Sequence, residues 1–141
     1  MQRITKNLVG KMKITHLTKA EEQVMQVLWE LGKGFVKDFI DKLPGKTRPA
    51  YNTVSTIIRI LERKGFIGHT DFGKTFEYYP LVSKTEYTKH YMGAFMKSYF
   101  GNSYKHLVSF FTNENKLSVA ELEELKTIME KEIKKKKSEK K

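Results

Sequence analysis

Residues 50–79 constrain the fold of this chain more than any other segment. A helical pattern of apolar residues ends at Gly65, and two short runs of β-forming residues follow, at 66–70 and 75–79. The four residues between the runs include Gly73, which can adopt the positive φ of a tight turn. The pattern predicts one amphipathic helix that leads directly into a two-stranded hairpin.

Two more helices are predicted before this segment. Thr18 and Glu21 form a capping-box pattern at the start of an apolar helical repeat that stops at Gly32. A second, shorter helix follows, and Pro44-Gly45 ends it. Three helices followed by a hairpin are typical of a winged helix-turn-helix, which presents its third helix to a DNA major groove.

The predicted third helix has two different faces. Val54, Ile57, Ile58 and Leu61 recur at helical spacing and should pack inward. The outward residues are short polar side chains and arginines, which suit a helix that lies deep in a groove and contacts bases or phosphates. We expect base-edge contacts from Asn52, Ser55, Thr56 and Arg59. We expect phosphate contacts from Lys46, Arg48, Thr53, Arg63 and, at the hairpin tip, Lys74.

The C-terminal part of the chain predicts further helices. Ser83 with Glu86 and Ser118 with Glu121 are capping-box patterns, and Gly101-Asn102 should break the helix between them. These helices carry more apolar surface than they can bury on each other, so pairing with an identical chain is expected. The residues expected at the dimer interface are Tyr91, Phe95, Tyr99, Leu107, Phe111, Leu122, Leu125 and Met129. A ligand or cofactor pocket lined by the methionine and aromatic stripe is the alternative.

The expected fold is therefore mainly α with a small β-hairpin: a winged helix-turn-helix domain and a C-terminal helical dimerisation region. Its parts would be a flexible basic arm (residues 1–13), the DNA-binding domain (14–82), the dimerisation region (83–133) and a basic tail (134–141). The lysine run of the tail should be frayed and solvated.

The positive charge of the chain indicates a polyanionic partner, and the most informative part of that charge lies around the predicted third helix. The net charge is +11, but residues 1–17 and 134–141 supply nine of those charges. Residues 44–64 contain five basic residues and one acidic residue. This local excess favours contact with nucleic acid at that helix.

Composition also excludes several classes of site. There is no cysteine, so disulfides and thiolate metal sites are excluded. No apolar run reaches the ~20 residues of a membrane helix, and no apolar block follows the N-terminal basic residues. We expect a cytoplasmic protein that is not inserted in the membrane, with no cofactor and no metal.

An enzymatic function is not expected. The histidines His16, His69, His90 and His106 are scattered, and neither a paired-carboxylate spacing nor a glycine-rich phosphate loop is present. Two non-enzymatic alternatives to a specific DNA-binding protein remain. The winged helix could serve protein–protein contacts, or it could be an architectural or RNA-binding module. The third helix exposes few aromatics, which argues against base stacking on single strands.

Several motifs, taken in order, resemble one family of regulators. They are residues 17–25 with Val27-Leu28-Trp29, Thr53-Val54-Ser55-Thr56, Lys64-Gly65-Phe66-Ile67, residues 76–82, and Leu117-Ser118 through residues 121–125. Together they are similar to the penicillinase and methicillin-resistance repressors (the BlaI/MecI/CopY family) over roughly residues 15–131.

The resemblance implies a homodimeric winged-helix repressor on a palindromic operator, controlling antibiotic-resistance or stress-response genes. In the antibiotic-sensing branch it also implies a membrane-embedded sensor protease that triggers cleavage within the dimerisation helices. The copper-sensing branch uses a cysteine cluster, which this chain lacks.

Two positions depart from the family pattern. Ile60 stands where the family usually has arginine, so base preference or the seating of the helix is expected to differ. Phe110-Phe111 replaces the asparagine–phenylalanine bond of the family's cleavage segment. The sequence leaves open whether release occurs by cleavage near this bond. The apolar segment would be cut only if exposed, and as a helix in a dimer it should be buried.

Overall fold

The computed structural model describes residues 15–45, 47–114 and 117–139, and it forms two compact units. The boundary between the units lies between Gly93 and Ala94, inside one helix. The predicted basic arm, residues 1–13, lies outside the described residues. Among the described residues, no helix combines the length and the apolar composition that a bilayer-spanning segment requires.

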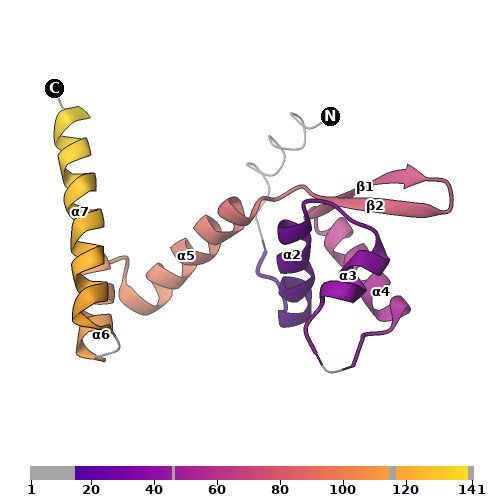
Figure 1. The fold of residues 1–141 in the computed structure, drawn as a ribbon, viewed down its shortest axis with the longest axis horizontal. Coiled ribbons are helices and arrows are strands. Elements are labelled where there is room, and N and C mark those ends of the chain that lie inside the picture. Colours follow the sequence, from indigo (N-terminus) through magenta and orange to yellow (C-terminus); the bar gives the residue numbers. More distant parts are fainter. Residues whose placement is uncertain (1–14, 46, 115–116, 140–141) are drawn as a thin grey trace. The chain divides into compact units, whose positions relative to one another are not determined.

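From residue 15 onward, the described part of the first unit contains three helices, a hairpin and the start of a fourth helix. Its elements are α2 (Lys19–Leu31), α3 (Val36–Lys42), α4 (Tyr51–Arg63), β1 (Ile67–Phe72), β2 (Thr75–Pro80) and the beginning of α5 (Lys84–Phe100). The hairpin extends beyond the three helices (Figure 1). The mainly α fold with a small β-hairpin, predicted as a winged helix-turn-helix, is confirmed.

Local chemistry sets the helix boundaries. The Thr18 hydroxyl accepts a hydrogen bond from the Glu21 N–H, and the Glu21 carboxylate accepts one from the Thr18 N–H, so the predicted capping box starts α2. Ser83 and Glu86 make the same reciprocal pair before α5. These side chains satisfy N–H groups that have no partner within their helix.

The hairpin is tighter than the sequence indicated. Phe72 pairs with Thr75, so the turn contains only Gly73 and Lys74, whereas a four-residue connection over 71–74 was predicted. Gly73 has φ of +65°, which allows the short turn. Phe76 is 42% exposed, while Tyr78, two residues further along β2, is 4% exposed. The distal end of the hairpin therefore lacks core to pack against.

One continuous core joins the elements of the first unit. The largest fully buried side chains in it come from α2 (Met25, Leu28), α3 (Phe39), α4 (Ile58, Leu61) and the start of the hairpin (Phe66, Ile67). A β-bridge between Gly34 and Tyr78 fixes the hairpin against the loop before α3. Trp29 packs at the edge, and its indole Nε1 donates a hydrogen bond to the Val82 carbonyl at 2.9 Å. The core thus fixes α4 and the hairpin in one orientation.

An ion pair ties the start of α2 to the end of α4. The Lys64 Nζ lies 2.8 Å from the Glu21 carboxylate, whose side chain is only 7% exposed. Burial raises the pKa of the Glu21 carboxyl, but the hydrogen bonds from Lys64 and Thr18 together with the Lys64 charge outweigh it, so the pKa lies below the ordinary value of a glutamate. Glu21 is therefore ionised in the folded protein at neutral pH.

Glu21→Gln is expected to lower the free energy of unfolding at pH 7 by ~1–2 kcal/mol, because it removes one charged partner of the pair. A carboxyl whose folded pKa is depressed stabilises above its unfolded pKa and loses that contribution as pH falls through the folded pKa. The difference in the free energy of unfolding between wild type and variant should therefore disappear below about pH 4. Urea titrations across pH would check this, with Glu30→Gln as the exposed control. A difference in unfolding free energy that stays constant down to pH 3 would contradict this prediction.

The second unit contains the rest of α5, α6 (Tyr104–Asn113) and α7 (Val119–Glu139). Gly101 and Asn102 both have positive φ and break the helix as predicted. Ser118 and Glu121 form the predicted capping box of α7. The lysine run does not fray: α7 continues to Glu139, and its lysines are exposed. Glu130 and Glu132 each stand four residues before a lysine, a spacing that supports helix.

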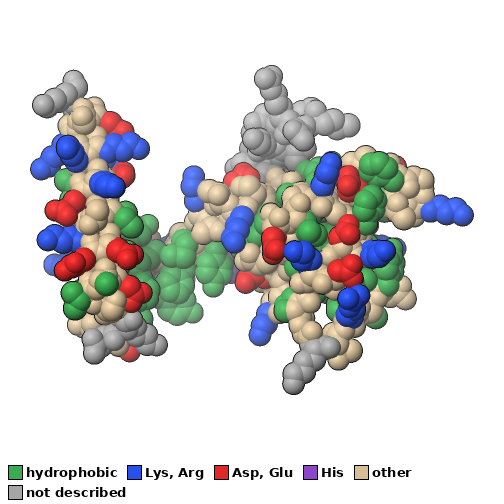
Figure 2. All heavy atoms as spheres, viewed as in Figure 1, with side chains coloured by type: hydrophobic (Ala, Val, Ile, Leu, Met, Phe, Trp, Pro, Cys, Tyr) green, Lys and Arg blue, Asp and Glu red, His purple; other side chains and the backbone are tan. Residues whose placement is uncertain are grey.

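None of the described residues of α6 or α7 is buried. Large apolar side chains are therefore exposed on both helices, including Phe110, Phe111, Leu122, Leu125, Ile128, Met129 and Ile133. The ring centroid of Phe110 lies 5.8 Å from that of Phe100 and 5.9 Å from that of Phe111. Figure 2 shows hydrophobic side chains gathered beside α7, whose outer surface carries mixed charges.

Candidate nucleic-acid interface

Helix α4 has the two faces that its sequence predicts. Val54, Ile58 and Leu61 are at most 1% exposed and pack in the core. Asn52, Thr53, Thr56, Arg59 and Arg63 are exposed, while Ser55 and Ile60 are half-buried on the flanks. The structure therefore leaves the polar side of the helix accessible to a partner.

A hollow of about 230 Å³ connects α4 with the hairpin. Ser55 and Arg59 line it from α4, and Lys74 lines it from the hairpin tip. Lys37 of α3 adds a third cation. Two helices and the hairpin thus bring three basic side chains to the rim of one concave surface, an arrangement that suits a phosphate backbone entering between them.

Of the residues that line this hollow, sequence reasoning predicted only Ser55, Arg59 and Lys74 as contacts; among those it missed are Lys37 and Tyr51. Tyr51, Ser55 and Arg59 lie four residues apart and form one face of α4, a spacing that could have identified Tyr51. Tyr51 is 58% exposed. Lys37 reaches the hollow only because α3 packs across α4, so no local signal in the sequence pointed to it.

Not all of the predicted contact residues are equally available. Arg48 already pairs with Asp41, with 2.9 Å between Nη1 and Oδ1. The Thr56 hydroxyl donates to the Asn52 carbonyl at 2.8 Å, so toward a base it can act only as an acceptor. Lys46 lies outside the described residues.

An acidic side chain interrupts the basic surface of α4. Glu62 lies between Arg59 and Arg63 along the helix and pairs with Nδ1 of His69 in β1. The other ring nitrogen of His69 is 3.6 Å from Asp71. Burial and the Glu62 charge raise the pKa of Tyr78 beside them, so its hydroxyl stays protonated. This pairing links α4 to the hairpin, and Glu62 lines a surface hollow together with Arg59 and Arg63.

The N-terminus of α4 is open to an anion. Its N-cap is Ala50, which has no side-chain acceptor, and its first turn contains no acidic residue. Helices α2 and α6 each have a hydroxyl cap. The free N–H groups and the positive end of the helix dipole can therefore contribute to a phosphate contact.

Lys37→Ala is expected to weaken binding to every duplex alike, because a lysine at the rim contacts the backbone and not a base. The slope of log affinity against log salt should flatten by about 1 per protomer. Fluorescence anisotropy titrations at several salt concentrations would measure both effects, with Lys19→Ala on α2 as a charge-matched control. An unchanged salt slope would place Lys37 outside the interface.

Comparison with known proteins decides the family. The family model described as penicillinase repressor matches residues 17–131. The chain belongs to the penicillinase repressor family. This is a family of DNA-binding transcriptional repressors and not of enzymes.

Two relatives show how far the similarity extends along the chain. The methicillin resistance regulatory protein MecI of Staphylococcus aureus (strain N315) is 28% identical over 119 residues, which cover 84% of this chain and 97% of MecI. The penicillinase repressor of Bacillus licheniformis is 26% identical over 118 residues, 84% of this chain and 92% of the relative. The similarity therefore spans nearly the whole of both penicillinase repressor family members.

Two solved structures match about half of the chain. The DNA-binding domain of the repressor BlaI in solution is 28% identical, with a TM-score of 0.46, covering 53% of this chain and 92% of that domain. Monomeric BlaI of Bacillus licheniformis in complex with the blaP half-operator is 28% identical, with a TM-score of 0.44 and the same coverage.

Proposed function

We propose that this chain is a sequence-specific transcriptional repressor that binds a palindromic operator as a homodimer and blocks transcription sterically. The observation that carries the proposal is the shared hollow, which places Arg59 on α4 and Lys74 on the hairpin tip at one concave surface. In this mechanism α4 enters the major groove and the hairpin lies over the adjacent backbone.

The roles of individual residues follow from their accessibility. Asn52, Ser55, Thr56 and Arg59 would read base edges, with Thr56 as an acceptor. Thr53, Arg63, Lys74 and Lys37 would contact phosphates, and Lys46 and Arg48 complete the predicted set. Arg48 would have to leave Asp41 to contribute.

The second unit supports a dimer. Leu122, Leu125 and Met129 are 39%, 41% and 50% exposed and follow each other along one side of α7. A soluble monomer rarely leaves such a contiguous apolar surface uncovered. A second copy of the chain, related by a two-fold axis, would cover it and fix the spacing of the two α4 helices. We retain residues 14–82 as the DNA-binding domain, 83–133 as the dimerisation region and 134–141 as a basic tail.

The names of the relatives suggest which genes are regulated. MecI is a methicillin resistance regulatory protein, and the Bacillus licheniformis protein is a penicillinase repressor. We accordingly propose antibiotic-resistance or stress-response genes as targets, and a cytoplasmic location for the repressor.

A membrane-embedded sensor protease is the second partner that we propose. Helix α6 carries Phe110-Phe111, and these side chains are 49% and 45% exposed in a single chain. A dimer that covers them would protect this helix from cleavage, so proteolysis would require local opening first.

Selection from a random duplex library with the purified full-length chain would test the proposed function. The expected product is an inverted repeat with two half-sites of equal sequence. Enrichment of no sequence, with binding that depends only on duplex length, would instead support an architectural nucleic-acid module. Retention of protein partners without any duplex would support a protein–protein interaction module.

A further inference from the structure

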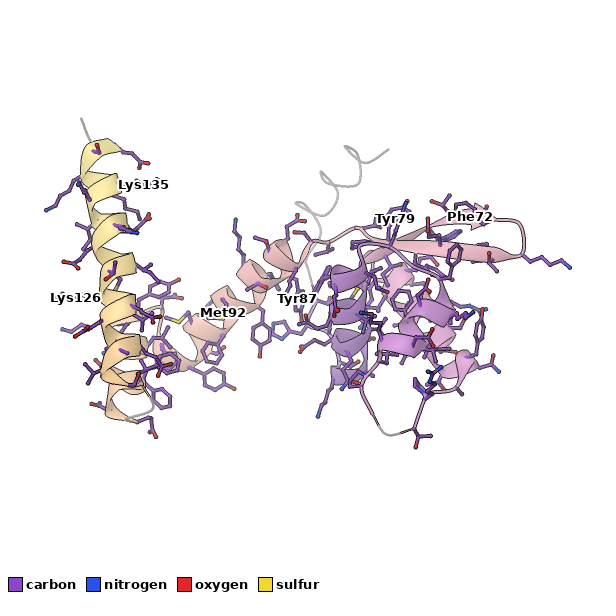
Figure 3. All side chains as sticks on the ribbon, viewed as in Figure 1. Phe72, Tyr79, Tyr87, Met92, Lys126 and Lys135 are labelled. Carbon is purple, nitrogen blue, oxygen red and sulfur yellow. The ribbon has the colours of Figure 1, made fainter. Side chains whose placement is uncertain are left out.

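A second hollow lies within the first unit, between α2 and the start of α5, and the DNA-binding mechanism does not use it. Its volume is about 220 Å³. It is lined by Glu22, Gln26 and Trp29 of α2 and by Tyr87, Tyr91 and Met92 of α5. Tyr87 and Met92 of α5, both labelled in Figure 3, are among the residues that line it.

Three aromatic rings form a continuous wall of this hollow. The ring centroids of Trp29 and Tyr87 are 6.0 Å apart, and those of Tyr87 and Tyr91 are 6.3 Å apart, with interplanar angles of 37° and 36°. The two neighbouring pairs of rings therefore have nearly the same angle between their planes. All three residues line the hollow, so one ligand in it can contact all three.

Hydrogen bonds hold two of these rings in place. The Trp29 indole donates to the Val82 carbonyl, and the Tyr87 hydroxyl accepts from the Leu17 N–H at 3.0 Å. Tyr87 is 6% exposed, so its ring cannot rotate away. Tyr91 is 43% exposed, and its ring lies 5.6 Å from His16. The wall is thus largely preorganised, which lowers the entropic cost of binding.

The charge of the hollow is negative. Glu22 is exposed and has no ion-pair partner in the part of the chain that the structure describes. No lysine or arginine is among the residues that line the hollow. The faces of aromatic rings are also negative, because of their quadrupole. Aromatic faces and a carboxylate together favour a cation and disfavour an anion.

We propose that this hollow binds a small organic monocation, with a quaternary ammonium head against the rings of Trp29, Tyr87 and Tyr91 and within reach of the Glu22 carboxylate. A hydrated metal ion would gain little from ring faces, whereas a quaternary ammonium is weakly hydrated and carries its charge over apolar methyl groups. Met92 adds a polarisable apolar contact for the rest of the ligand. This site is separate from the DNA-facing hollow and shares no residue with it.

Trp29 is the single tryptophan of the chain, so its emission reports on the site directly. The probe is benzyltrimethylammonium chloride, added to the full-length protein at constant ionic strength. The uncharged para-tert-butylbenzyl alcohol, of similar size, is the matched ligand. We expect a saturable change in Trp29 emission with the cation, at least about fivefold tighter than with the alcohol.

Two variants test the residues of the site. Tyr91→Leu and Glu22→Gln should each weaken cation binding about threefold or more, while Glu30→Gln, also on α2, should leave it unchanged. Both altered residues are exposed, and circular dichroism melts would verify that the variants fold. A linear, non-saturating response, equal affinity for the alcohol, or an unchanged affinity in Glu22→Gln would overturn the proposal. Cation affinity that falls as the protein concentration rises would show that a second copy covers the hollow, which also overturns it.

Discussion

Arg59→Ala is expected to remove most of the preference for operator DNA over random duplex. Arg59 is exposed on α4 and lines the hollow between that helix and the hairpin, where its guanidinium can fork onto a guanine. The loss of one bidentate contact costs ~1–3 kcal/mol for each half-site and relaxes selection at one base position. Affinity for random duplex should fall much less, because nonspecific binding depends on total charge.

Lys74→Ala provides the contrasting result. Lys74 lies in the two-residue turn at the hairpin tip, where it can reach a phosphate but not a base. Its loss should weaken operator and random duplex by the same factor and flatten the salt slope. Titrations of both variants on both duplexes, with Lys89→Ala on α5 as a control, give the comparison. Equal losses on the two duplexes for Arg59→Ala would contradict base readout by α4.

The double variant Leu125→Glu/Met129→Glu is expected to be monomeric at micromolar concentration. Both side chains are exposed on one side of α7, and two added carboxylates in each chain would face each other across the proposed interface. Operator affinity should then fall at least about a hundredfold, since a monomer loses the effective concentration that links two half-sites. Binding to a single half-site should change little.

The matched control for this variant is Lys131→Glu, which reverses a charge on the opposite side of α7. Sedimentation equilibrium would give the oligomeric state, and anisotropy would give the affinities for full and half operators. A double variant that remains dimeric would place the dimer interface elsewhere. A monomeric variant with undiminished operator affinity would remove the dimer from the mechanism.

Local patterns allowed most of the elements to be predicted. The capping boxes at Thr18, Ser83 and Ser118 depend on residues three positions apart, and all three form as expected. The inward face of α4 depends only on helical periodicity. The same patterns could not show that the turn of the hairpin is two residues long, because register depends on the pairing of Phe72 with Thr75 across the strands.

The composition of the site was harder to predict, because side chains from different elements meet there. Lys37 joins the hollow through the packing of α3 on α4, and Asp41 pairs with Arg48 across a loop. The contact between Glu62 and His69 joins a helix to a strand. Sequence spacing identifies residues that share a face, but it does not identify the neighbours that neutralise their charges.

Hydroxyl-radical footprinting of the full-length chain on DNA upstream of its own gene would test the central claim most directly. If two α4 helices dock as a symmetric pair, protection should appear as two equivalent patches related by a dyad, about 10 base pairs or a small multiple apart. Arg59→Ala should reduce both patches together. A single patch without symmetry, or uniform protection along the duplex, would contradict the account.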